Sequence, residues 1–545
     1  MTVFIDWRKL IVPTMKNKRK HSKAAMFLLG LIFLACWDDR SVADIFGKVA
    51  ELNPGRDRKV QIMAFRGMRG SAPENTRPAL EKAIDDGMDW VWVDVRSTSD
   101  GIPVLFAGDA LEEKTSGSGM LSQKTFEEIA ALDAGEWFAE RFRGIHLLPL
   151  SEALGIIRNK IGLCMDCRGV DPERVLEMIR TSGVENQVLL SGTPEFLSEI
   201  RNLSGGQIAT LTEKSIEQLE QPVEEDAVKI PIRGFRPDQV KKIQGTGTQV
   251  VVDTREEDEP VSWQKAIESG ASCILTDRPE LALACLIHRE MTVPPVKWSL
   301  HRGAGLYAPE NTLPAFSLAA QFKADFIEFD VRKTREGDYF LLHDSKLNRT
   351  TNGQGPISEA STPLVATLDA GSWFSPQFKG EHVPTLDQFL ENVPDGIELY
   401  FDAKDISPAD LLKALEKYSL VSRTVVYQSA EYLSELHHLN PEIRVMPPLP
   451  DHGELEKVIA ELKPYAFDAG WRDLSAEVIQ NCHQLGVKVF ADSLGPFEQT
   501  QEYLKAIRWG IDLIQTDQPL KLLQAMEIAF KENKERLDPS GSIKK

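Results

Sequence analysis

The run Ala-Pro-Glu-Asn-Thr occurs at residues 72–76 and again at residues 308–312, so its second copy begins 236 positions after the first. The same offset aligns Asp-Val-Arg at 94–96 and 330–332, Leu-Asp-Ala-Gly at 132–135 and 368–371, Trp-Phe at 137–138 and 373–374, and the single residues Asp166 and Asp402. Five blocks in one register indicate an internal duplication. Near the ends of the copies the offset drifts to 240, because Thr-Asp at 276–277 matches Thr-Asp at 516–517.

Each repeated unit is about 240 residues long, which suits a (β/α)₈ barrel. In the second unit, short apolar runs at 326–331, 339–342, 397–401, 424–427 and 487–491 alternate with stretches of helical period such as 411–418. This alternation is typical of a parallel α/β barrel. We therefore predict an α/β protein made of two tandem TIM barrels, at residues 44–290 and 291–530. The join carries Pro294 and Pro295, and residues 531–545 are predicted to be a flexible tail.

The composition indicates a globular protein with an acidic surface. The 545 residues are 42% hydrophobic and 27% charged, with a formal net charge of −19. This charge weighs against nucleic acid as a partner, because nucleic-acid binding needs a basic face. A small anionic substrate needs only a local positive pocket. Cys164 and Cys167 form a Cys-x-x-Cys spacing, but no second pair or histidine cluster accompanies it. We interpret both as buried structural residues.

The N-terminal residues have the layout of a secretory leader. A basic stretch at 16–23 precedes an apolar run at 24–36, and charged residues follow at 37–40. The apolar run is shorter than a transmembrane helix needs. Cleavage after Ala43 fits the small-residue rule, and lipidation at Cys36 or an uncleaved membrane anchor are alternatives. In each case the protein is expected to be exported, as a periplasmic, secreted or membrane-anchored protein.

Acidic side chains follow the apolar runs of the second unit at points where a barrel gathers its reactive groups. Glu328 and Asp330 are two residues apart, so on a strand they share one face, and Asp402 ends another strand. Carboxylates this close repel one another unless a cation lies between them. Three carboxylates without a thiol favour Ca²⁺ or Mg²⁺ over zinc.

Two histidines and two cations are expected at the same rim. His301 and Arg302 follow one apolar run, His343 follows another, and Lys404 comes two residues after Asp402. A phosphodiester needs its charge neutralised, a base for the attacking hydroxyl and an acid for the leaving oxygen. The histidines can serve as acid and base, Arg302 and Lys404 can hold the phosphate, and Asp344 can orient a neighbouring group.

These motifs resemble the glycerophosphodiester phosphodiesterase family over nearly the whole second unit. The shared motifs are His-Arg-Gly at 301–303, Pro-Glu-Asn-Thr at 309–312, Glu-x-Asp at 328–330, His-Asp at 343–344, Leu-Asn-Arg-Thr-Thr-Asn-Gly at 347–353 and Thr-Asp-Gln-Pro at 516–519. The resemblance implies a TIM barrel of the phospholipase-C-like phosphodiesterase type. It also implies a divalent ion at Glu328, Asp330 and Asp402, and an acid/base pair of His301 and His343.

The implied reaction begins when a glycerol hydroxyl attacks phosphorus to give a cyclic intermediate, which water opens to glycerol 3-phosphate. Candidate substrate contacts are Arg302, Lys404, Glu310 and Asp492. Two departures affect substrate fit and metal affinity. The family usually has Glu where this chain has Asp402, and it often has Trp-Thr where this chain has Ala491-Asp492.

The first unit lacks most of this chemistry. The offset of 236 places Phe65 at the position of His301, Trp92 at that of Glu328, and Ala107 and Gly108 at those of His343 and Asp344. Arg66, Asp94 and Asp166 remain, and Arg168 replaces Lys404. We predict an inactive barrel that packs against or positions the active one, and phosphate binding without turnover, through Arg66 and Arg168, is an alternative. Two further hypotheses for the chain are a phospholipase D-type transphosphorylase that releases a cyclic phosphate, and a non-catalytic binding or scaffold protein.

Overall fold

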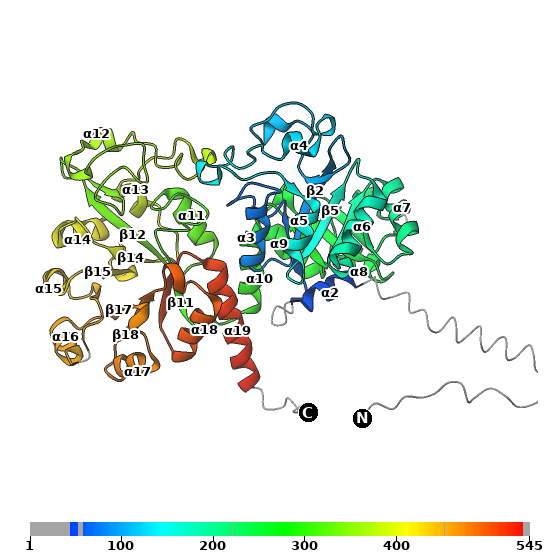
Figure 1. Cartoon of the computed structure of the whole chain (residues 1–545). Helices are drawn as coiled ribbons and strands as arrows, with labels where there is room; N and C mark the ends of the chain where they lie inside the picture. The colour runs from blue at the N-terminus through cyan, green and yellow to red at the C-terminus, as the bar shows by residue number, and fades with distance from the viewer. Residues whose placement is uncertain (1–43, 53–57, 221, 452, 538–545) are drawn as a thin grey trace, which may run out of the picture.

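The computed structural model describes residues 44–52, 58–220, 222–451 and 453–537, which form two barrels side by side (Figure 1). The predicted leader at 1–43, with Cys36, and residues 538–545 lie outside the described residues. Within the described part of the chain, no helix is both long and apolar enough to cross a membrane. Cys164 and Cys167 are free and buried in one strand.

The first barrel is a closed ring of eight parallel strands. In ring order these are β1 (Gln61–Phe65), β2 (Trp90–Ser97), β5 (Gly162–Cys167), β6 (Val188–Gly192), β7 (Ala209–Glu213), β8 (Ala227–Pro231), β9 (Gln249–Asp253) and β10 (Cys273–Thr276). The ring closes because β1 pairs with both β2 and β10. Two short strands, β3 (Pro103–Leu105) and β4 (Leu148–Pro149), continue antiparallel from β2.

Helices surround this ring and one helix closes its end. The outer helices are α3 (Arg77–Asp85), α5 (Leu150–Ile157), α6 (Pro172–Ser182), α7 (Pro194–Ser204), α8 (Pro237–Gln244), α9 (Pro260–Ser269) and α10 (Pro279–Glu290). The short helix α2 (Ile45–Ala50) precedes β1, and its Phe46 packs against Trp90 of the barrel interior with ring centroids 5.0 Å apart. Helix α2 therefore contributes side chains to the interior core of this barrel.

The second barrel also has eight parallel strands, but its ring is nearly rather than fully closed. The strands are β11 (Lys297–Leu300), β12 (Phe326–Lys333), β14 (Glu398–Asp402), β15 (Thr424–Tyr427), β16 (Arg444–Met446), β17 (Ala466–Gly470), β18 (Lys488–Asp492) and β19 (Leu513–Thr516). Between β16 and β17 the described residues form only an isolated bridge, from Pro448 to Asp468. Pro447 and Pro448 lack the N–H groups that a regular ladder needs, which explains the gap.

The helices of the second barrel repeat the pattern of the first. They are α11 (Leu313–Gln321), α13 (Leu386–Glu391), α14 (Pro408–Lys417), α15 (Ala430–Leu439), α16 (Leu455–Leu462), α17 (Ala476–Gln484), α18 (Thr500–Trp509) and α19 (Pro519–Leu537). Part of the predicted tail is therefore wrong, because residues 531–537 continue α19 as helix. Helix α19 packs against α10 of the first barrel, and Lys531 lies 2.8 Å from Glu527 one turn earlier in the helix.

The run at 339–342 was predicted to be a barrel strand, and this prediction is wrong. The run forms β13 (Tyr339–Leu341), which pairs antiparallel with β12. The five residues between these strands are too few for the crossover that a parallel neighbour requires. His343 therefore reaches the barrel mouth from a hairpin that leads into a small insertion containing α12 (Thr362–Val365).

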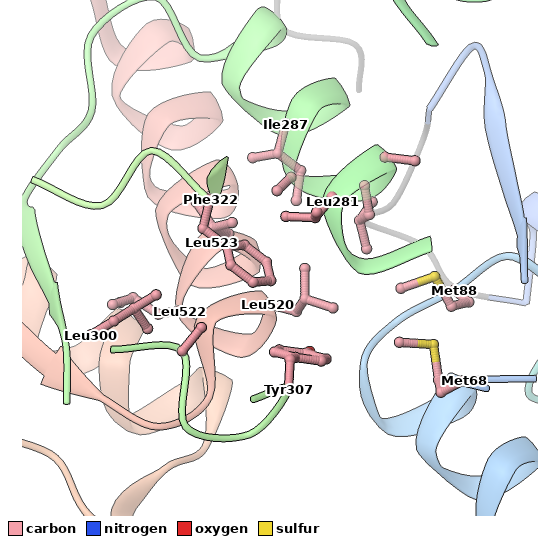
Figure 2. Packing of buried hydrophobic residues seen from close by; sticks show 14 of the residues in the cluster. Met68, Met88, Leu281, Ile287, Leu300, Tyr307, Phe322, Leu520, Leu522 and Leu523 are labelled. Atoms are coloured by element: carbon pink, nitrogen blue, oxygen red, sulfur yellow. The ribbon is translucent and has the colours of Figure 1, made fainter. Parts of the chain in front are cut away.

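The two barrels share one continuous hydrophobic core. Figure 2 shows Met68 and Met88 of the first barrel close to Tyr307 and Leu520 of the second. The last helices of the two units, α10 and α19, pack against each other. Two equivalent segments also meet, because Ser375 Oγ donates to the Phe138 carbonyl at 3.2 Å and Arg141 donates to the Phe374 carbonyl.

A buried ion pair crosses this interface. Arg58 Nη2 lies 3.2 Å from Glu527 Oε2, and both side chains are almost fully buried. Arg58→Ala is expected to lower the free energy of unfolding by about 3 kcal/mol, because it leaves a buried carboxylate with weaker compensation. Chemical unfolding followed by circular dichroism measures this loss. Arg77→Ala is the matched control, because Arg77 and its carboxylate partners Glu81 and Glu152 are exposed to solvent. This substitution should lower the free energy of unfolding by less than about 1 kcal/mol. Equal losses in both variants would contradict the prediction.

Candidate functional site

Three carboxylates gather at the C-terminal mouth of the second barrel. Glu328 and Asp330 lie on the interior face of β12, and Asp402 at the end of β14 is in register with Asp330. One carboxylate oxygen from each lies within 4.8 Å of the others, and Glu328 and Asp330 are buried. The predicted ligands are thus brought together, and they could hold a metal ion. An all-oxygen set of this kind fits Ca²⁺ or Mg²⁺.

The charges of this cluster are only partly compensated by the protein. Lys404 Nζ lies 2.5 Å from Asp402 Oδ2 and 3.2 Å from Asp330 Oδ1, and Arg302 Nε lies 3.4 Å from Asp330 Oδ2. Even so, burial and repulsion from Asp330 and Asp402 raise the pKa of Glu328 well above its usual range. Burial also raises the pKa of Asp402, despite Lys404. A bound divalent cation would offset this repulsion, so the residues present fit such an ion.

The backbone at Arg302 is held in an unusual conformation. Its φ of 54° lies in the left-handed region, and its N–H donates to Glu328 Oε2 at 2.7 Å. Such a conformation is costly for a residue other than glycine and is retained where the surroundings demand it. The next residue, Gly303, has a φ of 80°, and a Cβ there would lie 2.8 Å from the backbone of Ala315. The close approach of the loop after β11 to Ala315 of α11 therefore requires glycine at position 303.

Each histidine at the mouth has a carboxylate beside Nδ1. His301 Nδ1 lies 2.9 Å from Asp517 Oδ1, and His343 Nδ1 lies 2.8 Å from Asp344 Oδ1. Because an ionised carboxylate can only accept, Nδ1 must carry the proton in both rings. Nε2 is then the basic nitrogen of the neutral ring and an acid in the charged ring. The arrangement can both remove and supply a proton.

A second ionic network holds the side of the mouth near His343. Arg349 donates to Asp344 Oδ2 at 2.8 Å and to Glu310 at 2.7 and 2.8 Å, and Arg302 also donates to Glu310 at 2.9 Å. Hydrogen bonds from Arg349 lower the pKa of Asp344. Burial opposes ionisation of Glu310, but the bonds from Arg349 and Arg302 outweigh it and lower the pKa. Glu310, a predicted substrate contact, is thus held by two arginines.

Three residues of this site had no predicted role. Asp517 orients His301, Arg349 joins Asp344 to Glu310, and Asn311 donates to Asp330 Oδ2 at 2.9 Å. All three lie within motifs that the two units repeat or that carry the resemblance described above. Asn75 makes the same bond to Asp94 in the first unit at 3.0 Å, so the recurrence of the motif was the available signal.

Asp492 lies on the opposite side of the mouth, outside the metal-ligand cluster. Its Oδ1 is buried without a hydrogen-bond partner among the described residues. Burial, followed by repulsion from Asp468 and Asp402, raises its pKa well above the usual range. The predicted substrate contacts therefore fall into two groups, with Arg302, Lys404 and Glu310 beside the carboxylate cluster and Asp492 beside Asp468.

The mouth of the first barrel is filled and neutralised. Phe65 and Trp92 are buried with ring centroids 6.4 Å apart. Asp94 accepts from Arg66 at 2.6 Å, and Asp166 lies 3.1 Å from Arg168. Arginines thus provide the positive charge that a metal would provide in the second barrel. The positions of the two histidines hold Phe65 and Ala107, which cannot exchange protons.

Comparison with known proteins gives consistent matches to one family. The sequence model described as the glycerophosphoryl diester phosphodiesterase family matches residues 66–281 and 301–521. The glycerophosphodiester phosphodiesterase of Bacillus subtilis is 31% identical over 246 residues, which cover 40% of this chain and 82% of that protein. The one of Caldanaerobacter subterraneus is 30% identical over 241 residues, covering 41% and 94%. A solved glycerophosphodiester phosphodiesterase of Agrobacterium tumefaciens is 31% identical, covers 42% and 99%, and has a TM-score of 0.39.

The carboxylate cluster predicts a specific response to metal ions. At neutral pH, Ca²⁺ or Mg²⁺ at about 100 times its dissociation constant should stabilise the folded protein by about 2.7 kcal/mol. Because the pKa values of Glu328 and Asp402 are raised, these carboxyls hold protons that the metal must displace, so the effect should shrink as pH falls. Thermal unfolding with and without chelator, at pH 5 and pH 7.5, measures it.

The two units provide a matched pair of variants for this measurement. Asp402→Asn should abolish the metal-dependent rise in melting temperature, whereas Asp166→Asn at the equivalent position of the first unit should leave it. A rise that survives Asp402→Asn, or one that Asp166→Asn removes, would place the metal elsewhere.

Proposed function

The chain belongs to the glycerophosphoryl diester phosphodiesterase family, and on that premise we propose that its second barrel hydrolyses glycerophosphodiesters to glycerol 3-phosphate and an alcohol. One observation supports assigning the proposed activity to the second barrel. His301 and His343, each oriented by its own carboxylate, share one mouth with Glu328, Asp330 and Asp402. The first barrel has no counterpart of either histidine.

In the proposed mechanism the protein binds the phosphate and moves two protons. Arg302 and Lys404 lie beside the carboxylate cluster and attract the nonbridging oxygens. A divalent ion held by Glu328, Asp330 and Asp402 would neutralise charge on the phosphate and acidify the attacking hydroxyl.

One neutral histidine accepts the proton of the glycerol hydroxyl through Nε2 as oxygen attacks phosphorus. The other histidine, charged at that moment, gives its Nε2 proton to the departing alcohol oxygen. The product of this step is a cyclic phosphate. In the second step the histidines exchange roles. The ring that lost its proton takes one from water as the water oxygen attacks phosphorus, and the other ring gives its proton to the glycerol oxygen that leaves phosphorus, which yields glycerol 3-phosphate. Asp517 and Asp344 keep the two rings in the tautomer that this exchange requires.

The first barrel is proposed to be an inactive partner that stabilises the second. Its mouth is filled by Phe65 and Trp92, while its interface side contributes to the shared core. We further propose that the protein is exported, on the leader-like sequence of residues 1–43. That segment would either be cleaved or attach the protein to a membrane.

Removal of either histidine should stop turnover. His301→Ala and His343→Ala are each expected to lower kcat by about 10² to 10⁴-fold, the range typical of a lost general acid or base. Release of glycerol 3-phosphate from glycerophosphocholine measures this change. His438→Ala is the control, because His438 lies exposed on α15 away from the mouth. Wild-type turnover in either mouth variant would contradict the mechanism.

The histidine variants also test the first barrel within the intact chain. If the first barrel is inactive, the His301→Ala, His343→Ala double variant should not hydrolyse any glycerophosphodiester above background. Phosphorus NMR of the wild-type reaction separates the two enzyme hypotheses. A glycerol 3-phosphate product supports hydrolysis, whereas an accumulating cyclic phosphate would show a transphosphorylase.

A further inference from the structure

A cavity of about 490 Å³ lies at the mouth of the first barrel, where β7, β8 and β9 end. Its lining includes Lys229, Asp253 and Arg255, together with the exposed carboxylates of Glu213 and Glu256. We call this space the β8–β9 pocket. Lys229 is only 5% exposed, which is rare for a lysine. A buried ammonium group is unfavourable unless negative charge lies close to it, so the surroundings of Lys229 decide what the pocket can bind.

The charge of Lys229 is only loosely compensated. Its Nζ lies 3.3 Å from Glu213 and 3.6 Å from Asp253, and both distances exceed the roughly 2.7–2.9 Å of a charge-assisted hydrogen bond. Asp253 is already bound by Arg255, whose Nε and Nη2 lie 2.8 and 2.6 Å from its two oxygens. Burial opposes ionisation of Asp253, but the bonds from Arg255 outweigh it and lower the pKa. The remaining partner, Glu213, has a side chain that is 62% exposed, so water screens its charge.

Two aromatic rings support the cations of the β8–β9 pocket. Lys229 Nζ lies 4.8 Å from the centroid of the Trp92 ring, and Arg255 Cζ lies 3.8 Å from the centroid of the Phe65 ring. The face of an aromatic ring attracts a cation. Trp92 and Phe65 are the two residues that stand where the second barrel has a carboxylate ligand and a histidine. The side chains at these two positions therefore hold positive charge at the mouth of the first barrel.

The second barrel has neither of these cations at the equivalent positions. The register of β8 with β9 matches that of β17 with β18, so Lys229 takes the place of Asp468. Arg255, two residues after the end of β9, takes the place of Leu494, two residues after the end of β18. Both differences make the first mouth more positive, and loss of the histidines alone would require neither. The β8–β9 pocket is therefore a feature of the first barrel and not a remnant of the chemistry of the second.

The two arginines that the sequence suggested for phosphate binding are committed to other partners. Arg66 lies 2.6 Å from Asp94, and Arg168 lies 3.1 Å from Asp166. An anion at either arginine has to compete with a carboxylate at hydrogen-bond distance. Lys229 has only the longer contacts given above, so the structure favours the β8–β9 pocket over Arg66 and Arg168 as the place for an anion.

We propose that the β8–β9 pocket binds a small phosphate dianion, as inorganic phosphate or as a phosphate monoester, without a metal ion and without turnover. The phosphate takes the place of the exposed Glu213 as the partner of Lys229. It also accepts from Nη1 of Arg255, because Asp253 holds the other two nitrogens of that guanidinium group. An ammonium and a guanidinium group can bind different oxygens of one phosphate. Binding at this pocket does not require turnover by the second barrel, although glycerol 3-phosphate, the product proposed for that barrel, belongs to this class of ligand.

Isothermal titration calorimetry of the full chain tests this pocket. The protein is first freed of metal with a chelator and dialysed, so that no divalent ion remains to bind phosphate in the second barrel. Inorganic phosphate and glycerol 3-phosphate are then titrated separately at pH 8, with chloride at equal ionic strength as the control anion. Both phosphates should bind, and chloride should not. Tighter binding of glycerol 3-phosphate identifies the monoester as the ligand, whereas equal affinities identify the phosphate group alone.

Variants of the two cations locate the site. Lys229→Met and Arg255→Leu, which copies the second barrel, should each weaken phosphate binding by about tenfold or more. Arg255 is partly exposed, so its variant tests the pocket even if Lys229→Met fails to fold. Arg233→Leu is the matched control and should keep the wild-type affinity, because the Arg233 side chain is 78% exposed. Absence of phosphate binding by the metal-free wild type, or an unchanged affinity in Arg255→Leu, would overturn the proposal and leave the proposed hydrolysis by the second barrel untouched.

Discussion

Mutual repulsion among carboxylates is the constraint on which the second barrel depends. Glu328 and Asp330 lie buried on one strand face, and Asp402 faces them from the next strand. Burying like charges is unfavourable unless positive charge lies between them. The left-handed backbone at Arg302, the amide of Asn311 and the ammonium of Lys404 all act on this cluster. Much of the polar structure of the mouth serves to hold these charges together.

The first barrel avoids the same repulsion among carboxylates by using different side chains at its mouth. It retains the backbone frame, since Arg66 has a φ of 61° and Asn75 one of 58°, close to their counterparts. It loses one carboxylate to Trp92 and pairs the other two with arginines. Apolar side chains therefore extend further toward the mouth inside the first barrel, where Phe65 and Trp92 belong to the interior core, than inside the second barrel. The two mouths therefore differ by a few side chains on a similar backbone frame.

The sequence predicted the large features well, because they depend on local spacing. The offset of 236 placed both barrels, and the two-residue spacing of Glu328 and Asp330 placed them on one face. Features that depend on tertiary contacts were missed. The run at 339–342 has the composition of a barrel strand, and only its short connection reveals the hairpin. Asp468 gave no signal, because its setting arises from the gap between β16 and β17 and from Tyr400 on a distant strand.

The contact between the barrels joins equivalent parts of the two units. The last helix of one unit packs on the last helix of the other, and the segments around Phe138 and Phe374 exchange hydrogen bonds. Contacts of this kind are those of an isologous interface, in which the same surface of two identical subunits meets itself. The chain thus has the arrangement of a symmetric homodimer whose subunits have been joined end to end. In such a fused dimer one active site can degenerate while its subunit remains necessary, because the other subunit still needs the surface that it covers.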